Sequence, residues 1–564
     1  GVHDRAAKAV PLSDRVRAVL RVDAAELTPA ELIRAVLGAP VDLLYFGGIG
    51  TYVRASTEDD AAIDDRANAD VRVPATDVRA RVVGEGANLA MTQRSRVELA
   101  RRGSRVNMDA IDNAAGVDCS DHEVNVKILL AEAERDGRID RPERDALLAA
   151  HADDVVAAVL ADCAAQSDAL DRAERAAPGD VDGLARVLRE LVADEVLDPD
   201  VEALPDEAEL AARAAAGAGL TRPELAVLLA GEKRRVAADL LASGAPDDPA
   251  LRDALVDYFP PALAERFDDL LDRHRLRREL VASEVANDLV DHLGLTAASA
   301  LRAELDVGTA EIALAYRVAR AVVGSPARWE AMAAGRVAVD PTIAAEPLDG
   351  GDLLAGLLRG LTRDELIRRR GRERAGGGWD AAARIAEDRP VADALAARPD
   401  VGPEAEGAVR QRALRLAAGG LAPDVAEATA RLPALEVVPD VAAVARDLGL
   451  DPVAVAAALA AVEHRLGLTD LWRRTDALPG VGEWAATARR GLLDDLIGIR
   501  REAARRALAD RPDLDPDDAV AAHLDRRAAA VAEASAVRRR LAVDVDAGFD
   551  ALTVAVRAVR RAVL

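Results

Sequence analysis

Aromatic residues are scarce in this chain of 564 residues, and the chain has no excess of positive charge. Aromatics make up only 2% of the sequence, which leaves few side chains on which nucleic-acid bases could stack. The formal net charge of −25 opposes the basic surface that a nucleic-acid-binding protein presents. Together these two features argue against DNA or RNA as a partner.

Cysteine and long hydrophobic runs are equally scarce. The two cysteines, Cys119 and Cys163, do not suggest a disulfide scaffold in a chain of this length, so we expect both to be reduced thiols. No stretch reaches the roughly 18 uncharged apolar residues that a membrane span requires, and the first residues lack a signal-peptide pattern. These absences predict a cytoplasmic protein with no membrane partner.

The chain changes character near residue 130. Before that point apolar strands alternate with helices: Thr28, Pro29 and Glu31 form a helix-start signal, and the strand VDLLYF follows at residues 41–46. After it, apolar positions recur at helical intervals and strand-like alternation is scarce. We predict an α/β region, a partial Rossmann-like nucleotide-binding domain, followed by a large, mainly α-helical C-terminal region.

The length also predicts more than one domain, because 564 residues exceed what a single core usually organises. We predict the α/β region over residues 1–130, a helical domain over 131–375 and a helical subdomain over 376–564. The run AGGG at residues 375–378 is the expected hinge between the last two.

Local signals predict further elements on both sides of residue 130. Residues 55–76 are acidic and irregular, consistent with a covering helix and loop whose charges are solvated. Two T-x-x-E patterns, which begin at Thr221 and Thr362, predict helix starts. Tyr258 and Phe259 precede two prolines and are expected to fill an interface between helices.

The run over residues 81–127 is the most informative part of the chain, because its pattern alternates strand, glycine turn and helix twice. Gly84 and Gly86 follow an apolar strand in G-x-G-x-x-x-A spacing, which removes the Cβ atoms that would keep backbone away from a ligand. Asn88 comes next, at the mouth of a helix expected over residues 89–102. The first amides of that helix would face the occupant of the crevice.

A second turn follows a strand that we expect over residues 106–111. Asp112 and Asn113 would sit at the carboxyl edge of this strand, where open α/β sheets bind ligands. Ser120 and Glu123 then form the S-x-x-E capping box that we expect to start the next helix.

Spacing alone leaves several interpretations of this run open. The glycine turn could be a dinucleotide fingerprint, with Asp109 or Asp112 as the acidic residue on the ribose, or it could serve ordinary packing. Asn113 could tolerate a left-handed turn, and Ser120 could act only as a helix cap. Residues 118–123 hold several potential metal ligands, but adjacent residues on a helix point in different directions, so we expect no metal there.

Four strings of the chain resemble the large bacterial NAD-specific glutamate dehydrogenases. They are GGIGTYV from Gly47, VVGEGANLAMTQ from Val82, IDNAAGVDCSDHEVN from Ile111 and AGLTRPELAVLLA from Ala218. The resemblance extends through residue 329 and becomes general helical character beyond it. It implies that the chain is the carboxyl-terminal part of such an enzyme, comprising the end of the catalytic cofactor domain and the helical C-terminal domain.

The resemblance also implies roles for individual residues. Asn88 and Asn113 would contact the nicotinamide of NAD or its ribose, and Ser120 would hydrogen-bond the glutamate substrate. The cofactor crevice would be lined by four glycines, Gly47, Gly48, Gly84 and Gly86. The chain departs from the family at Tyr45 and Phe46, where many members carry Trp and Asn.

The activity that the resemblance implies is the NAD-dependent oxidative deamination of L-glutamate to 2-oxoglutarate and ammonium, with formation of NADH. The family's catalytic lysines and pyrophosphate fingerprint are expected in an amino-terminal part of the same polypeptide. We therefore assign no catalytic residue to this chain, expect it to be inactive alone, and expect a homo-oligomer. The alternative is a non-catalytic helical scaffold or regulatory module with a dehydrogenase-like remnant.

Overall fold

The computed structural model describes residues 3–337, 349–374, 378–397, 406–478, 483–544 and 547–563. The chain separates into two compact units, which are considered one at a time. Unit 1 comprises Gly1–Ala303 and Gly308–Ala313, and unit 2 comprises Glu304–Val307 and Leu314–Leu564. The hinge predicted at residues 375–378 falls largely outside the described residues.

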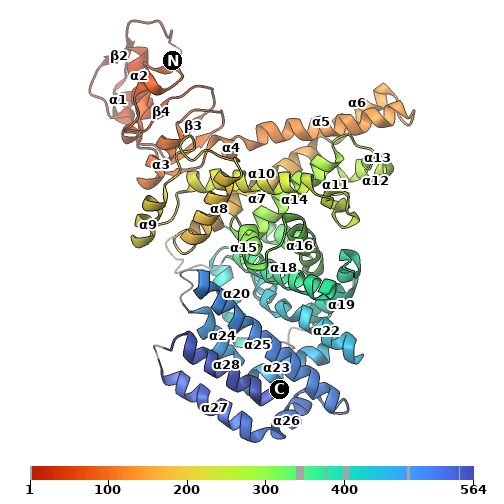
Figure 1. Cartoon of the computed structure of the whole chain (residues 1–564). Helices are drawn as coiled ribbons and strands as arrows, with labels where there is room; N and C mark the ends of the chain where they lie inside the picture. The colour runs from red at the N-terminus through yellow and green to blue at the C-terminus, as the bar shows by residue number, and fades with distance from the viewer. Residues whose placement is uncertain are drawn as a thin grey trace. The chain divides into compact units, whose positions relative to one another are not determined.

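A small parallel sheet organises the amino-terminal end of unit 1, drawn in red and orange in Figure 1. Its strands are β3 (Leu43–Phe46), β6 (Val82–Glu85) and β7 (Arg105–Val106), and they lie in the order β3-β6-β7. These strands bury one apolar cluster that includes Phe46 and Val83. The strand predicted in VDLLYF and the apolar strand predicted before Gly84 are confirmed.

Shorter elements surround this sheet. Strands β1 (Val10–Pro11) and β2 (Glu26–Leu27) pair antiparallel on either side of helix α1 (Asp14–Leu20), and β4 (Val53–Arg54) pairs parallel with β5 (Val73–Pro74). Helix α2 (Pro29–Leu37) begins with the predicted capping box: Thr28 accepts the amide of Glu31, and the Glu31 carboxylate accepts the amide of Thr28.

The covering helix predicted within residues 55–76 is wrong. The structure has 3-10 turns there, η1 (Asp60–Ala62) and η2 (Arg66–Asn68), and a third, η3 (Ala75–Asp77), follows β5. The carboxylates of Asp59 and Asp65 accept backbone amides just ahead of them in the chain. Aspartate side chains that bond locally in this way compete with the helical hydrogen-bond ladder, so the segment closes in tight turns instead.

The glycine turn after β6 also differs from the prediction. Strand β6 continues through Gly84, and helix α3 (Gln93–Arg101) begins only after Thr92, whose hydroxyl caps it. Residues 88–91 are irregular because the carbonyl of Ala90 accepts amides from Tyr52 and Val53 beside it. Backbone groups committed to this neighbouring segment are not available to a helix starting at residue 89.

The strand predicted over residues 106–111 ends at once, because β7 stops at Val106 and two helices follow it, α4 (Asp109–Asp112) and α5 (Ala114–Arg135). Ser120 therefore lies inside α5 and caps nothing: its hydroxyl donates to the carbonyl of Val117. Its supposed capping partner Glu123 pairs with Lys127 one turn ahead. The predicted capping box at Ser120 is wrong, and Gly137, with φ +70°, follows the end of α5.

The rest of unit 1 is helical. Its helices are α6 (Arg141–Ala150), α7 (Ala152–Ala176), α8 (Val181–Ala193), α9 (Glu207–Ala215), α10 (Arg222–Ala242), α11 (Arg252–Tyr258), α12 (Pro261–Arg266), α13 (Asp268–Leu271), α14 (Arg277–Leu293) and α15 (Ala297–Leu305), with 3-10 turns η4 (Ala245–Asp247) and η5 (Pro249–Leu251). The capping box at Thr221 and Glu224 starts α10 as predicted. Tyr258 and Phe259 are buried, which confirms their predicted place between helices.

The start of α10 bonds to the sheet region. The side chain of Gln93, at the start of α3, donates to the carbonyl of Pro223 at 3.1 Å, and Arg222 donates to the side chain of Asn107 just after β7. Arg101 at the end of α3 pairs with Glu209 of α9. Sheet and helices of unit 1 are thus connected by hydrogen bonds across a long stretch of sequence.

Unit 2 is built from helices. They are α16 (Thr309–Val323), α17 (Ser325–Ala334), α18 (Gly350–Arg374), α19 (Ala381–Ala397), α20 (Glu406–Ala418), α21 (Pro423–Ala430), α22 (Val438–Leu448), α23 (Pro452–Leu466), α24 (Leu468–Asp476), α25 (Glu483–Asp510), α26 (Pro516–Asp525), α27 (Ala528–Val543) and α28 (Phe549–Val563), with the 3-10 turn η6 (Leu432–Val437). Thr362 lies inside α18 and donates to the carbonyl of Leu358, so the helix start predicted there is wrong.

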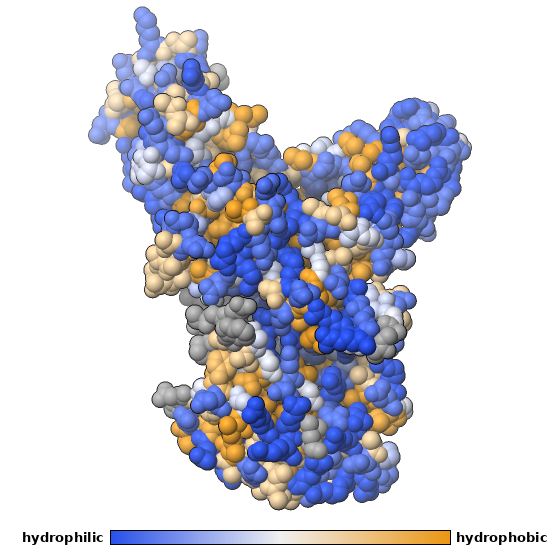
Figure 2. Space-filling view, viewed as in Figure 1, coloured by the Kyte–Doolittle hydropathy of each residue, from blue (hydrophilic) through white to orange (hydrophobic). Residues whose placement is uncertain are grey.

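The surface is mostly polar on the face drawn in Figure 2, with hydrophobic side chains scattered among hydrophilic ones. Among the described residues, no helix combines the length and the apolar character that crossing a membrane demands.

Candidate functional site

The predicted site residues gather around the edge of the sheet where β3 and β6 end. Because these strands are parallel, their carboxyl ends meet at one edge. Gly47 and Gly48 directly follow β3 and are exposed, and Gly86 directly follows β6. Gly84 lies within β6, opposite Tyr45 of β3.

The ring of Tyr45 covers two of these glycines. A Cβ atom added at Gly86 would overlap the hydroxyl oxygen of Tyr45, and one added at Gly84 would lie 3.2 Å from the ring. The side chain of Tyr45 therefore lies across both glycines, although the residue itself is 63% exposed. A ligand that bound over these glycines would displace the exposed ring of Tyr45 and leave the hydrophobic core in place.

Asn88 and Asn113 lie together. The amide nitrogen of Asn113 donates to the side-chain oxygen of Asn88 at 2.8 Å, from the junction of α4 and α5 to the loop after β6. Asn113 has φ −106°, so the alternative that it serves a left-handed turn is wrong. The paired amides leave the nitrogen of Asn88 to donate and the oxygen of Asn113 to accept.

Beneath this loop lies a group of three charged side chains, Glu85, Arg96 and Asp109, which we call the closed cluster. Arg96 of α3 donates to both carboxylate oxygens of Glu85, at 2.7 and 2.9 Å, and lies 3.4 Å from Asp109. All three residues are buried. Burial raises the pKa of the Glu85 carboxyl above its usual value, while the bonds from Arg96 oppose that shift.

Two aspartates fix the shape of the loop. Asp109 accepts the amide of Leu89 at 2.8 Å, which holds Leu89 at φ +63°, and Asp112 accepts the amide of Glu85 at 2.9 Å. The fingerprint interpretation offered these same two carboxylates to a ribose. In this structure both already accept hydrogen bonds from the protein's own backbone.

Ser120 occupies a different position from the asparagine pair. It is exposed on α5, one turn beyond Gly116. Its proton is used in the bond to Val117, so its oxygen lone pairs are left to accept a hydrogen bond from a ligand.

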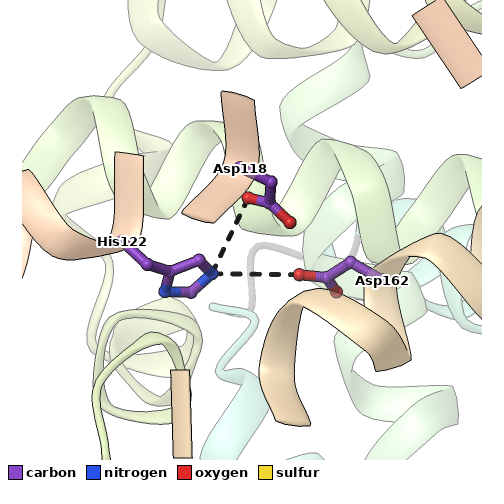
Figure 3. Close-up of side chains that lie close together, drawn as sticks. All are labelled: Asp118, His122 and Asp162. Carbon is purple, nitrogen blue, oxygen red and sulfur yellow. Dashed lines mark ion pairs between the residues drawn. The ribbon is translucent and has the colours of Figure 1, made fainter. Parts of the chain in front are cut away.

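A second group, which we call the open cluster, consists of Asp118, His122 and Asp162 (Figure 3). Asp118 and His122 come from α5, and Asp162 comes from α7. The Nε2 atom of His122 lies 3.8 Å from Asp118 Oδ1 and 3.9 Å from Asp162 Oδ2. Sequence reasoning considered the α5 residues but had no signal for Asp162, which belongs to no motif.

Glu284 of α14 is a further acidic side chain near the open cluster. Burial raises the pKa of the Glu284 carboxyl to about 8, and the charges of Asp162, Asp118 and Asp288 raise it further than Lys233 lowers it. The open cluster thus lies in a region where carboxylates outnumber cations.

Comparison with known proteins identifies the family. A sequence family described as "Bacterial NAD-glutamate dehydrogenase, catalytic domain" matches residues 1–173, and one described as "Glutamate dehydrogenase, C-terminal" matches residues 217–561. The second match covers more than half of the chain, and the chain therefore belongs to the glutamate dehydrogenase family, in its bacterial NAD-specific branch. The resemblance seen in four motifs is confirmed.

Three curated relatives are each named "NAD-specific glutamate dehydrogenase". The chain is 44% identical to the protein of Mycobacterium tuberculosis over 345 residues, 43% to that of Halomonas elongata over 330 and 45% to that of Pseudomonas aeruginosa over 326. These matches cover 60, 58 and 58% of the chain but only 21, 20 and 20% of the relatives. The chain thus spans a small part of their length.

Proposed function

We propose that the chain is the carboxyl-terminal part of an NAD-dependent glutamate dehydrogenase that converts L-glutamate to 2-oxoglutarate and ammonium in the cytoplasm. The observation that carries this proposal is the meeting of Asn88 and Asn113 at the edge of the parallel sheet. Both lie in strings that first suggested the family, and the family matches cover both. The remainder of the polypeptide would supply the catalytic lysines and the pyrophosphate fingerprint.

The donors and acceptors of this pair suit the nicotinamide of NAD. A carboxamide offers one oxygen acceptor and two N–H donors, which match the free nitrogen of Asn88 and the free oxygen of Asn113. The exposed backbone of Gly47 and Gly48 at the same edge leaves room for close approach. We infer that β3, β6 and β7 form the end of a Rossmann-like sheet whose other strands belong to the rest of the polypeptide.

NAD, when bound, would accept a hydride from the α-carbon of glutamate. The residues of this chain would then orient the cofactor and the substrate without reacting themselves. Asn88 and Asn113 would hold the carboxamide, and Ser120 would hydrogen-bond the substrate. Holding the reacting atoms in line contributes to rate without any proton transfer by these side chains. Gly84 and Gly86 would line the crevice once the ring of Tyr45 moved aside.

Substitution of Asn88 in the full-length enzyme tests this proposal. Asn88→Ala removes one partner of the amide pair, and we expect KM for NAD to rise about tenfold, the equivalent of one lost hydrogen bond. Ser120→Ala is the matched variant, because it should raise KM for glutamate and leave KM for NAD unchanged. Steady-state kinetics with each substrate varied in turn measure both. Unchanged kinetics in Asn88→Ala would remove this residue from the site.

The alternative, a non-catalytic helical scaffold or regulatory module, is favoured by the size of unit 2, a helical assembly longer than the sheet region. Calorimetry of NAD binding to this chain and to a polypeptide extended at the amino terminus separates the two functions. Binding and glutamate turnover by the extended polypeptide support the dehydrogenase. Absence of both in the extended polypeptide supports the scaffold. Association into a homo-oligomer is compatible with either function and is proposed from the family.

A further inference from the structure

We propose that Asp118, His122 and Asp162 bind a divalent first-row transition-metal ion between helices α5 and α7. This proposal is independent of the dehydrogenase function, because it rests on side chains other than those assigned to cofactor or substrate.

The spacing of the three side chains is the first argument. One ligand atom from each, the His122 nitrogen and a carboxylate oxygen from each aspartate, lies within 4.8 Å of the other two. Separations of 3.8 and 3.9 Å from Nε2 to the carboxylates are too long for hydrogen bonds. They match two ligands on either side of one ion, since metal–nitrogen and metal–oxygen bonds are about 2.0–2.2 Å each.

The environment of His122 is the second argument. The residue is 3% exposed, and its Nδ1 atom has no hydrogen-bond partner in the described part of the chain. Its Nε2 atom points at the gap between the two carboxylates (Figure 3). Buried polar side chains are almost always hydrogen-bonded, so an imidazole whose Nε2 lies at ion-pair distance, but not hydrogen-bond distance, from two carboxylates points to a ligand between them.

Packing holds the imidazole in this orientation without the help of an ion. The ring of His122 stacks on Tyr258 with centroids 4.2 Å apart and planes 10° apart. The hydroxyl of Tyr258 accepts a hydrogen bond from Asn125 at 2.9 Å, and Asn125 also bonds to the carbonyl of Asp121. A nitrogen ligand fixed in this way loses little freedom when a metal binds.

The carboxylates leave the cluster accessible. The side chain of Asp162 is 51% exposed and that of Asp118 is 30% exposed, so an ion can enter from solvent and keep water in its remaining positions. One imidazole with two carboxylates suits ions such as Zn²⁺ and Mn²⁺, whereas Mg²⁺ prefers oxygen alone. The ion would join α7 to the helix whose first turn follows Asn113.

Metal binding by the whole chain tests the proposal directly. All variants carry Cys119→Ser and Cys163→Ser, because free thiols would bind Zn²⁺ on their own. After dialysis against EDTA, titration with Zn²⁺ in a calorimeter is expected to show one equivalent. Asp162→Asn, at a half-exposed position, is expected to weaken binding at least tenfold, and His122→Ala to abolish it.

Asp121→Asn is the matched control, since Asp121 is an exposed carboxylate on α5 whose side chain is not part of the open cluster. It should bind Zn²⁺ like the parent. If His122→Ala fails to fold, Asp162→Asn and Mn²⁺ paramagnetic resonance still decide the matter, because bound Mn²⁺ loses its free-ion signal. Absence of binding in the parent, or equal affinity in Asp162→Asn and Asp121→Asn, would overturn the proposal. An ion pair of His122 with the two carboxylates is the arrangement that such a result would support.

Discussion

The closed cluster and the open cluster of unit 1 differ in how their charges are satisfied. In the closed cluster, Arg96 lies at hydrogen-bond distance from both oxygens of Glu85. In the open cluster, the ion pairs of Asp118 and Asp162 within the described part of the chain are both with His122, at 3.8 and 3.9 Å, beyond hydrogen-bond distance. Both groups contain buried polar side chains, but only the closed cluster pairs its carboxylates with a guanidinium, which is always charged.

The difference indicates which cluster is structural and which can bind something. A buried pair joined by two short bonds stabilises one arrangement of the chain and has no capacity left for a ligand. An imidazole and two carboxylates separated by the width of an ion retain that capacity. Substitutions should therefore destabilise the protein strongly at the closed cluster and weakly at the open one.

The largest effect is expected from Glu85→Ala. It removes the carboxylate that accepts two hydrogen bonds from the buried guanidinium of Arg96, and breaking a buried pair in this way costs about 3–5 kcal/mol of unfolding free energy. Urea unfolding followed by far-UV circular dichroism measures it. All four tryptophans, Trp329, Trp379, Trp472 and Trp484, lie in unit 2, so the transition seen by tryptophan fluorescence should not change.

The control for this substitution is an exposed pair in the same sheet region. Asp42 pairs with Arg81 while both side chains are largely exposed, so Asp42→Ala should cost less than about 0.5 kcal/mol. A loss below about 1 kcal/mol in Glu85→Ala would show that the closed cluster is not the structural element inferred here.

An intermediate effect is expected from substitution of Glu284, near the open cluster, and it should depend on pH. The pKa of Glu284 is raised to about 8, so the folded chain binds more protons than the unfolded chain between about pH 4.5 and 8. Stability contributed by the protonated carboxyl is complete below that range and is lost as the pH rises through 8. In the presence of a chelator, Glu284→Gln should therefore reduce the loss of unfolding free energy between pH 6 and pH 9. We expect a reduction of roughly 1–3 kcal/mol after partial solvent screening.

Hydrogen exchange of α14 in unit 1 at the two pH values measures this change. Glu279→Gln on the same helix is the control, because Glu279 is exposed and its substitution should leave the pH dependence as it is. An identical pH profile in Glu284→Gln and the parent would contradict the expected titration.

The smallest effect is expected from Asp162→Asn in metal-free protein. The side chain is 51% exposed and its oxygen is 3.9 Å from His122, so its loss should change the unfolding free energy by no more than about 0.5 kcal/mol. Thermal unfolding with EDTA measures this value. A cost comparable to that of Glu85→Ala would mean that the open cluster is a structural ion pair after all.

Local signals in the sequence predicted the elements that depend on neighbouring residues alone. The capping boxes at Thr28 and Thr221 form as expected because all their partners lie within one turn. The same pattern failed at Ser120 and Thr362, because each lies inside a helix that has already begun. The pattern identifies two side chains that can form a capping box. It does not give the backbone conformation that makes one of them an N-cap.

The candidate site was predictable to the extent that family motifs marked it. Asn88 and Asn113 came from two such motifs, and the structure brings them into contact. The loop that carries Asn88 is held by Asp109, and the open cluster is completed by Asp162 on another helix. Neither contact could be deduced, because each depends on how distant segments pack and not on spacing along the chain.

The bonds between the start of α10 and the sheet region affect how the protein can be cut into pieces. The side chains of Gln93 and Asn107 in the sheet region form hydrogen bonds with residues of α10, which lie far beyond residue 130. A fragment ending near that residue would lose these partners and would expose apolar surface that α10 covers on α3. A protease acting on native protein should accordingly leave the sheet region and α10 together in one resistant piece.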